Sequence, residues 1–415
     1  MSLPADFLTG ARRLIPPERL FDDPLSTLAF GTDASFYRLI PKLVVRVESE
    51  AEVVRLLHLA TRHKVPVTFR AAGTSLSGQA ISDSVLIVLG DYWNGREIRD
   101  GGNQIRLQPG VIGAQANAVL APLGRKIGPD PASINACKIG GIVANNASGM
   151  CCGTAQNSYQ TLAGMRLVLA DGTVLDSEDE RGVAAFRQSH GALLEQLAEL
   201  GRETRANTAL AERIRHKYRL KNTTGLSLNA LVDFDDPLDI LTHLMVGSEG
   251  TLGFISSVTY NTVPEYPHKA SALIVFPDVD TCCRAVPVLK QQPVAAVELL
   301  DRRSLRSVQD QPGLPGWVAA LSDGACALLI ESRAASQSLL HEQLAQIRAA
   351  LAPFPVEQQV DFTEDPAVSG QLWAIRKGTF PAVGAVRATG TTVIIEDVTF
   401  PVEQLAAGVH RLIAL

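Results

Sequence analysis

The most constraining feature of this sequence is the order of its first regular segments: a strand, a helix and a strand that lead directly into a loop rich in glycine and serine. Lys42–Val47 has the apolar composition of a strand. Ser49 and Glu52 have the spacing of a capping box, in which two groups satisfy free backbone donors at a helix start. Val65–Phe69 predicts the second strand, and the loop Arg70–Ala80 follows it at once. We therefore expect a fold of mixed helices and strands with an irregular loop at the end of a strand.

The loop Arg70–Ala80 has the composition of an anion-binding turn. Gly73 and Gly78 lack a Cβ, so the backbone can adopt a positive φ and approach a ligand closely. Successive backbone amides and three hydroxyl groups could then surround a pyrophosphate. Gln79 stands where a P-loop requires lysine, and no Gly-x-Gly-x-x-Gly fingerprint occurs, which excludes both of those nucleotide-binding classes. An ordinary surface loop is the alternative.

Two further glycine-rich stretches follow. Lys138–Gly149, which comes just after Gly128–Ser133, has small residues and almost no charge, and we interpret it as a loop that packs against a flat ring. Gly247–Gly253 again permits close approach of the backbone, with Glu249 supporting the turn through hydrogen bonds rather than taking part in chemistry. A tight glycine-rich turn without a ligand is the alternative in each case.

The composition is that of a soluble globular protein. The chain has 415 residues, of which 46% are hydrophobic and 20% charged, and roughly 150 residues per domain gives two or three domains. The net charge of −5, with both signs mixed, argues against a nucleic-acid partner. The basic run from Arg213 to Lys221 is interpreted as a solvated helical edge. No apolar run approaches the roughly 20 residues of a membrane span, and no signal peptide is evident, so a cytoplasmic location is expected.

The cysteines and histidines do not predict a metal site. None of the six cysteines forms a Cys-x-x-Cys pair, and no two of the eight histidines have His-x-x-x-His spacing. We therefore expect reduced thiols and no bound metal.

The domain organisation follows from a change of character after Pro264 and Pro267. We expect a lead-in at residues 1–36, a first domain at 37–266 and a second, α+β domain at 267–415. The last segment, Pro401–Leu415, starts as an apolar helix with no closing cap. The second domain is therefore expected to be incomplete at its C-terminal end.

Several stretches, in this order and spacing, resemble the FAD-linked oxidases of the vanillyl-alcohol oxidase and p-cresol methylhydroxylase type. The similarity is greatest to D-lactate, glycolate and D-2-hydroxyglutarate dehydrogenases, and among these to bacterial proteins that fuse a flavin half to an iron–sulfur half. The matching stretches are Arg70–Ala80, Gly128–Ser133, Ile139–Gly153, Gly247–Gly253, Leu372–Gly378 and Ile395–Pro401.

The resemblance implies a fold and a cofactor site. The fold is α+β, with a two-subdomain FAD-binding domain of the p-cresol methylhydroxylase type followed by a substrate, or cap, domain. Noncovalent FAD is implied, because the His that carries the flavin in some relatives is absent from the first loop. The cofactor-binding residues implied are Arg70, Gly73, Thr74, Ser75, Leu76, Ser77, Gly78, Gln79, Pro129, Asp130, Ser133, Gly140, Gly141, Asn145, Asn146, Ser148, Gly149, Gly153, Glu249, Gly250, Gly253 and Ile255.

The resemblance also implies a reaction. Arg376 matches an arginine that binds the substrate carboxylate, which suits a planar guanidinium, and Lys377 beside it is a weaker candidate. Oxidation of a small D-2-hydroxy acid to the 2-oxo acid is expected, with electrons passed to an iron–sulfur domain or another acceptor. The family's histidine-rich segment and the iron–sulfur cysteines have no match here. The alternatives are an FAD-carrying fragment or subunit with little activity alone, or an enzyme of the same fold resembling alkylglycerone-phosphate synthase.

Overall fold

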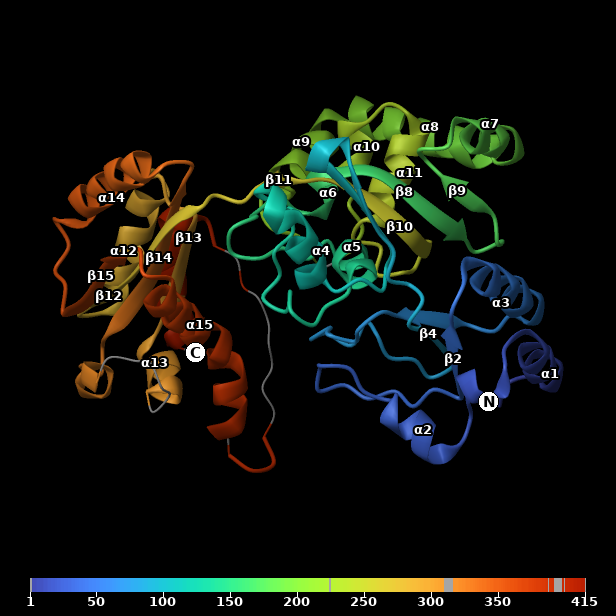
Figure 1. Cartoon of the computed structure of the whole chain (residues 1–415), viewed down its shortest axis with the longest axis horizontal. Helices are drawn as coiled ribbons and strands as arrows, with labels where there is room; N and C mark the ends of the chain where they lie inside the picture. The colour runs from blue at the N-terminus through green and yellow to red at the C-terminus, as the bar shows by residue number, and fades with distance from the viewer. Residues whose placement is uncertain are drawn as a thin grey trace. The chain divides into compact units, whose positions relative to one another are not determined.

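The computed structural model describes residues 2–223, 225–309, 316–386, 388–391, 398 and 400–414. The chain forms two compact units, unit 1 (Met1–Glu265) and unit 2 (Tyr266–Leu415), each with its own sheets and helices (Figure 1). The mixed helix-and-strand class predicted from the sequence is confirmed. Within the described ranges, no helix combines the length and the apolar character that crossing a bilayer requires.

The first sheet of unit 1 is mostly parallel and carries the glycine-rich loop. Its strand order is β1-β2-β4-β3, and β2, β4 and β3 run parallel to one another. The strands are β1 (Leu20–Phe21), β2 (Leu43–Val47), β3 (Val67–Arg70) and β4 (Val85–Leu89). The helices before and between them are α1 (Ala5–Leu14), α2 (Pro24–Ala29) and α3 (Glu50–His63). Phe7 and Ile15 of the N-terminal segment are buried in the same core as β2 and α3, so this segment is a packed part of unit 1.

The start of α3 differs in one detail from the capping box predicted there. Ser49 Oγ accepts a hydrogen bond from Glu52 N, as expected. Glu52 does not return the bond to Ser49. Its Oε2 accepts from Glu48 N at 2.7 Å, and its carboxylate pairs with Arg19. The reciprocal half of the box is therefore wrong, because a partly buried arginine from the N-terminal segment draws the carboxylate away from the helix start.

The second sheet of unit 1 is antiparallel, in the order β5-β6-β10-β8-β9. The strands are β5 (Arg96–Arg99), β6 (Gln104–Leu107), β8 (Leu162–Leu169), β9 (Val174–Asp176) and β10 (Gly253–Asn261); β7 (Arg125–Lys126) pairs separately with β11 (Val263–Pro264). The helices are α4 (Gly113–Leu120), α5 (Ile139–Asn145), α6 (Ser158–Thr161), α7 (Glu180–Ser189), α8 (Gly191–Ala206), α9 (Thr208–Lys217), α10 (Ala230–Asp233) and α11 (Pro237–Met245). Residues of α4, α5 and α11 share one core with the inner strands, which fixes α5 against the sheet.

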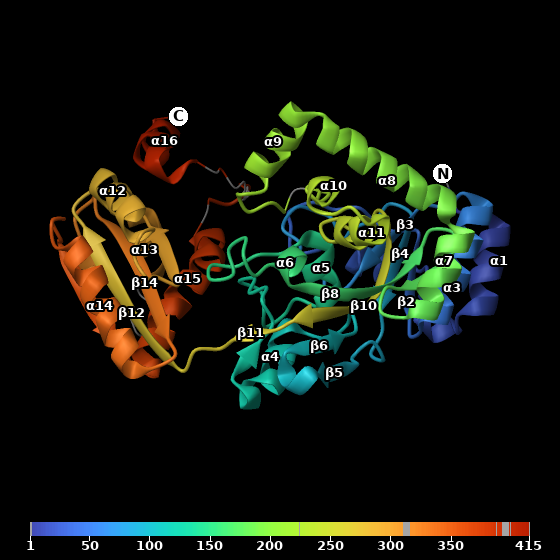
Figure 2. The same ribbon diagram turned by 90° about the horizontal axis from the view of Figure 1, so that it is seen from above.

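Unit 2 is a four-stranded antiparallel sheet in the order β13-β14-β12-β15. Its strands are β12 (His268–Phe276), β13 (Ala296–Leu300), β14 (Cys326–Ala334) and β15 (Gln358–Thr363). Its helices are α12 (Val279–Leu289), α13 (Arg302–Val308), α14 (Gln337–Leu351), α15 (Pro366–Val386) and α16 (Leu405–Ile413). Helices α12 and α14 cover one face of the sheet, and α13 and α15 lie on the other (Figure 2). Period-two alternation accounts for this, because Ile274 joins the core under α12 and α14 while its odd-numbered neighbours point the other way.

Candidate functional site

Three segments that are far apart in the sequence meet in unit 1. A Cβ placed on Gly141 of α5 would lie 4.0 Å from the Cβ of Ala71, at the end of β3. A Cβ on Gly250 would lie 3.9 Å from the ring of Phe69. Asn145 Nδ2 donates to Glu249 Oε1 at 2.7 Å, which ties α5 to the turn Gly247–Gly253. The three glycine-rich stretches singled out in the sequence therefore lie side by side at the end of β3.

The loop after β3 has the backbone expected of an anion-binding turn. Gly73 has φ +70° and Gly78 has φ +77°, a conformation that other residues rarely adopt. Ser75 Oγ accepts hydrogen bonds from the amides of Ser77 (3.2 Å) and Gln79 (3.3 Å), so this hydroxyl holds the loop together. Among the described residues, no hydrogen-bond acceptor serves the amides of Thr74, Ser75, Leu76 and Gly78. These amides are available to a bound anion.

Arg70 places a positive charge beneath this loop. Its Nη1 donates to the carbonyl of Phe30 at 3.1 Å, and a Cβ on Gly73 would lie only 2.5 Å from the guanidinium. Burial lowers the pKa of Arg70 from its ordinary value, and Asp33 nearby opposes this effect. A guanidinium in direct contact with the backbone of Gly73 adds to the electrostatic attraction for an anion at these amides.

The stretch Lys138–Gly149, interpreted from the sequence as a loop, is in part a helix. Residues Ile139–Asn145 form α5, and Asn146 ends it in the left-handed conformation with φ +53°. The glycines lower helix propensity, but Gly140 packs so closely on Pro109 that a Cβ there would lie 2.8 Å from the proline Cβ. Tertiary packing therefore accounts for the helix, and Gly141 is left exposed beside Ala71.

Several predicted cofactor residues near α5 have structural partners of their own. A Cβ on Gly149 would lie 1.7 Å from the carbonyl oxygen of Asp130, so only glycine fits there. The carboxylate of Asp130 accepts from the amides of Cys151 (3.1 Å) and Cys152 (3.2 Å). Asn146 Oδ1 accepts from Tyr159 N at 3.2 Å. These residues shape the loop after α5, whereas Gly153, with φ +50°, has open space where a Cβ would be.

The remaining predicted residues of this region are also placed in unit 1. The carbonyl oxygen of Ser133 accepts hydrogen bonds from the amides of Ala136 and Cys137. Ser148 Oγ donates a hydrogen bond to the carbonyl of Asn146 at 3.4 Å. Pro129 is buried. Gly253 and Ile255 belong to β10, and Ile255 is a core residue.

The turn Gly247–Gly253 contributes an ionisable group and a buried hydroxyl. Glu249 has φ +53°, and its amide donates to the carbonyl of Ala144 at 2.8 Å. Burial raises the pKa of Glu249 to about 7, and the hydrogen bond from Asn145 opposes this rise. Ser248 Oγ is buried and has no hydrogen-bond partner within the described part of the chain. The sequence analysis did not select Ser248, although its position between Gly247 and Glu249 could have suggested it.

These features fit a dinucleotide cofactor. Amides without acceptors at two positive-φ glycines suit a diphosphate, and the exposed Gly141 lets a flat ring approach the backbone. The buried Ser248 hydroxyl and the Glu249 carboxyl add polar groups that can bind a heterocycle's edge. Among the described residues, no group of three or more His, Cys, Asp or Glu side chains could hold a metal ion.

Arg376 lies in unit 2, on α15. Its Nε donates to Glu298 Oε2 of β13 at 2.6 Å, and both side chains are partly exposed. The buried residues Leu372, Trp373 and Ile375 hold this part of the helix on the sheet. The side chain of Lys377 lies outside the described residues, as do Ile395–Asp397 and Thr399 of the last matching stretch.

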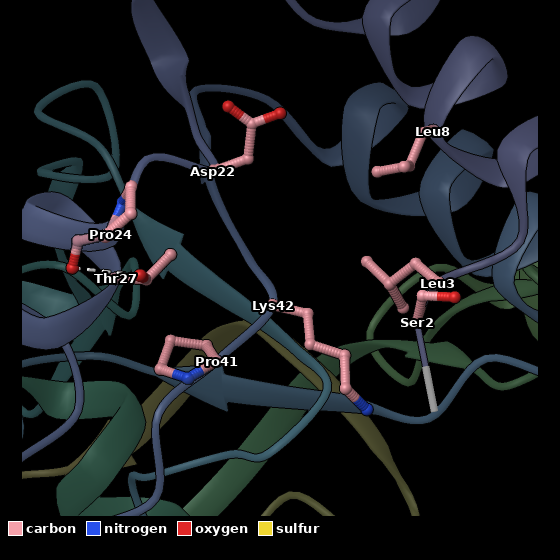
Figure 3. A pocket seen from close by; sticks show the side chains of 8 residues that line it. All are labelled: Ser2, Leu3, Leu8, Asp22, Pro24, Thr27, Pro41 and Lys42. Carbon is pink, nitrogen blue, oxygen red and sulfur yellow. Dashed lines mark hydrogen bonds between the residues drawn. The ribbon is translucent and has the colours of Figure 1, made fainter.

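Two open hollows elsewhere in unit 1 contain none of the predicted site residues. One, of about 480 Å³, lies among N-terminal side chains that include Leu3, Asp22 and Lys42 (Figure 3). The other, of about 560 Å³, lies beside α9 and is lined by residues that include Arg213 and Tyr218. Figure 3 shows apolar, polar and charged side chains spread around the first hollow, with one hydrogen bond from Thr27 to the carbonyl of Pro24. That hollow has no arrangement of groups that would support catalysis.

Comparison with known proteins finds two family domains. Residues 41–178 match the FAD binding domain, and residues 265–415 match the C-terminal domain of FAD linked oxidases. The chain is 25% identical to a D-2-hydroxyglutarate dehydrogenase of Pantoea ananatis over 91% of its length, and it covers 39% of that protein. It is 28% identical to the glycolate oxidase subunit GlcD of Escherichia coli, again over 91% of its length, and it covers 65% of that protein.

A solved structure gives the same fold. An alkyldihydroxyacetonephosphate synthase superposes with a TM-score of 0.62 at 16% identity, covering 92% of this chain and 64% of that one. The chain thus spans less than two thirds of the length of each of these three relatives.

Proposed function

Because the chain belongs to the FAD-linked oxidases, with FAD as its cofactor, we propose that it oxidises a small D-2-hydroxy acid to the 2-oxo acid. The substrate class is that of D-lactate, D-2-hydroxyglutarate or glycolate, and the names of the relatives support the last two. When bound, FAD supplies the acceptor for the hydride that leaves C2 of the substrate, and the proton of the substrate hydroxyl group passes to a base. The electrons then pass to an iron–sulfur domain or another acceptor.

The observation that carries this proposal is the meeting of three segments at the end of β3. The free amides of Thr74 and Leu76 would bind the diphosphate of FAD, with Arg70 adding positive charge. The exposed Gly141 would admit the flat ring system. No His lies between Arg70 and Ala80, which supports noncovalent attachment.

Arg376 would bind the substrate carboxylate. A guanidinium can form two parallel hydrogen bonds with a carboxylate and so fix its orientation. Positioning of this kind lowers the barrier to reaction by holding the reacting carbon in place. We also propose a cytoplasmic location, since all six cysteines are free thiols, as expected in a reducing compartment.

The decisive experiment is an anaerobic titration of the FAD-loaded protein with paired D- and L-2-hydroxy acids. We expect the flavin absorbance to bleach with a D-acid and to remain with its L-enantiomer. Protein that stays colourless after incubation with FAD would contradict the cofactor site. Protein that is yellow and is bleached by no acid in the panel would favour an FAD-carrying subunit or another reaction.

A variant tests the role of Arg376 separately. Arg376→Ala should raise the KM for the acid about 10- to 100-fold through loss of charged hydrogen bonds, with FAD affinity unchanged. Arg348→Ala is the matched control, because Arg348 pairs with Asp361 on the exposed surface of the same unit. Equal weakening of FAD and acid binding by Arg376→Ala would count against the assignment.

A further inference from the structure

We propose that Glu298 is a positioning residue, which orients the guanidinium of Arg376 so that its two terminal nitrogens face the substrate carboxylate. The inference rests on the proposed function, because it deepens the role given there to Arg376. It starts from one contact: Arg376 Nε donates to Glu298 Oε2 at 2.6 Å. Glu298 lies in β13 and Arg376 in α15, so the contact joins the sheet to the helix that covers it.

The planar geometry of a guanidinium explains how a contact at Nε can orient the terminal nitrogens of Arg376. The group has five N–H donors in one plane, and a carboxylate can bind across the Nε side or across the end formed by Nη1 and Nη2. Glu298 binds at Nε, so the Nε side is taken. Among the described residues, no other acceptor binds Arg376. The described residues therefore leave the end-on pair of nitrogens available to a carboxylate, and the side chain is 35% exposed, which makes it reachable.

The strand register places Glu298 on the correct face of the sheet. Glu298 pairs with Leu329 of β14, which pairs with Leu273 of β12. Directly paired residues point to the same face, and residues two apart on one strand do so too. Glu298 therefore shares its face with Ser271, two residues before Leu273.

Ser271 anchors α15 on that face. Trp373 Nε1 donates to Ser271 Oγ at 3.0 Å, and the neighbouring Leu372 and Ile375 are buried. Arg376 follows Trp373 by three residues, so both lie on neighbouring positions of the same helical face. The helix is fixed at Trp373, and Glu298 then fixes the flexible side chain one turn later. An arginine held at both its backbone and its Nε loses less conformational freedom when a carboxylate binds.

A competing interpretation is that Glu298 blocks Arg376 and must be displaced by the substrate. The two interpretations predict opposite effects of removing the carboxylate. If Glu298 positions the arginine, its loss weakens carboxylate binding. If Glu298 competes, its loss strengthens binding. The contact at Nε alone favours positioning, because a competitor would take the end-on nitrogens.

The experiment measures binding of propionate to the FAD-loaded full chain by calorimetry or NMR titration, with propionamide as the uncharged probe of equal size. Propionate carries the carboxylate but has no hydroxyl to oxidise, so binding is measured without turnover. The variants are Glu298→Ala, Glu298→Gln and Arg376→Ala. Asp361→Ala is the control, because it breaks an Arg–carboxylate pair on the exposed surface of the same unit. FAD affinity and the thermal unfolding midpoint are recorded for each variant.

We expect Glu298→Ala to weaken propionate binding up to about tenfold, the usual cost of ordering one long side chain on binding. Glu298→Gln keeps an acceptor for Nε and should bind propionate at least half as tightly as the wild type, a rescue that a merely structural role would not show. Asp361→Ala and all propionamide affinities should be unchanged. For turnover, Glu298→Ala should raise KM and leave kcat within about twofold.

The outcomes separate the two proposals. If Arg376→Ala weakens propionate binding and Glu298→Ala does not, or tightens it, the positioning role is overturned and the proposed function stands. If Arg376→Ala leaves propionate binding intact, or the wild type binds propionate no better than propionamide, Arg376 does not bind the carboxylate. The roles proposed for Arg376 and for Glu298 are then both wrong. Should Glu298→Ala fail to fold, Glu298→Gln and Glu298→Asp decide: binding by the shorter aspartate as tight as the wild type would overturn the inference.

Discussion

At the scale of single residues, Glu249 shows how burial changes the charge of a group in the proposed cofactor site. Its carboxyl group accepts a hydrogen bond from Asn145, and its backbone is tied to Ala144 of α5. Burial raises its pKa to about 7 against the opposing effect of Asn145. At neutral pH the group is therefore close to half protonated, and it can either accept or donate a hydrogen bond at small cost.

Glu249→Gln should remove a pH dependence of stability. Between pH 4.5, the ordinary pKa, and about 7, the folded protein holds a proton on Glu249 that the unfolded chain has lost. The stability due to this proton is complete below pH 4.5 and is lost as the pH rises through about 7. Glutamine keeps the acceptor for Asn145, so the variant should match the wild type near pH 4 and exceed it by about 2 kcal/mol at pH 8, allowing for partial exposure.

Urea unfolding of the FAD-free protein across this pH range measures the difference. Glu212→Gln, on the exposed surface of α9, serves as the control and should follow the wild type. If the unfolding free energies of Glu249→Gln and the wild type change in parallel with pH, the pKa of Glu249 has its ordinary value and the prediction is wrong.

At the scale of elements, local sequence predicts some segments well and others poorly. The start of the helix Glu50–His63 was predicted, because a helix cap is a local signal. The helix α5 was wrongly interpreted as a loop. Its stability comes from contact with Pro109 and the core, and no property of Ile139–Asn145 alone reveals those partners.

The same limit applies to the site. Glycine spacing indicated the three stretches of unit 1, since positive φ and close approach depend on the residue itself. The pairs Asn145–Glu249 and Arg376–Glu298 could not be predicted, because each joins elements brought together only by sheet order. Ser248 was not predicted for a similar reason. Its hydroxyl group has no hydrogen-bond partner among the described residues because of the way the turn packs.

Two glycines of the stretch Lys138–Gly149 should respond differently to alanine. Gly141→Ala adds a methyl group whose nearest neighbour is 4.0 Å away, so the FAD-free protein should keep or slightly gain stability, as alanine favours helices by about 1 kcal/mol. If a flat ring lies against Gly141, the same methyl group should lower FAD affinity at least about tenfold. Flavin fluorescence titration and thermal unfolding give the two values.

Gly149→Ala is the contrasting variant, since its methyl group would overlap the carbonyl of Asp130. It should destabilise the FAD-free protein by roughly 2 kcal/mol or more. Unchanged FAD binding by Gly141→Ala would place the cofactor away from α5.

At the scale of the whole molecule, the two proposed roles, binding of FAD and binding of the acid, belong to different units. All the segments that would hold FAD lie in unit 1, whereas Arg376 and its support, Glu298 and Trp373, lie in unit 2. Each unit has its own buried core, as an independently folding domain requires. Binding of the cofactor and recognition of the acid are therefore separable properties.

A fragment of residues 1–265 should fold and bind FAD within about tenfold of the full chain's affinity. It should not be bleached by any hydroxy acid that bleaches the full chain, because the carboxylate site is missing. A fragment of residues 266–415 is the control and should bind no FAD. A folded but colourless 1–265 fragment would mean that unit 2 contributes to the cofactor site.

The turn that carries Glu249 adds to the proposed cofactor site from a late part of unit 1. While the polypeptide is being synthesised, the loop after β3 emerges first and α5 follows, but Asn145 of α5 lacks its partner Glu249 until Gly247–Gly253 leaves the ribosome. Contacts between such distant segments form slowly, after the local ones. A nascent chain that stalls before this turn would lack the bond between Asn145 and Glu249, and the proposed binding site for the vitamin-derived chromophore would be incomplete.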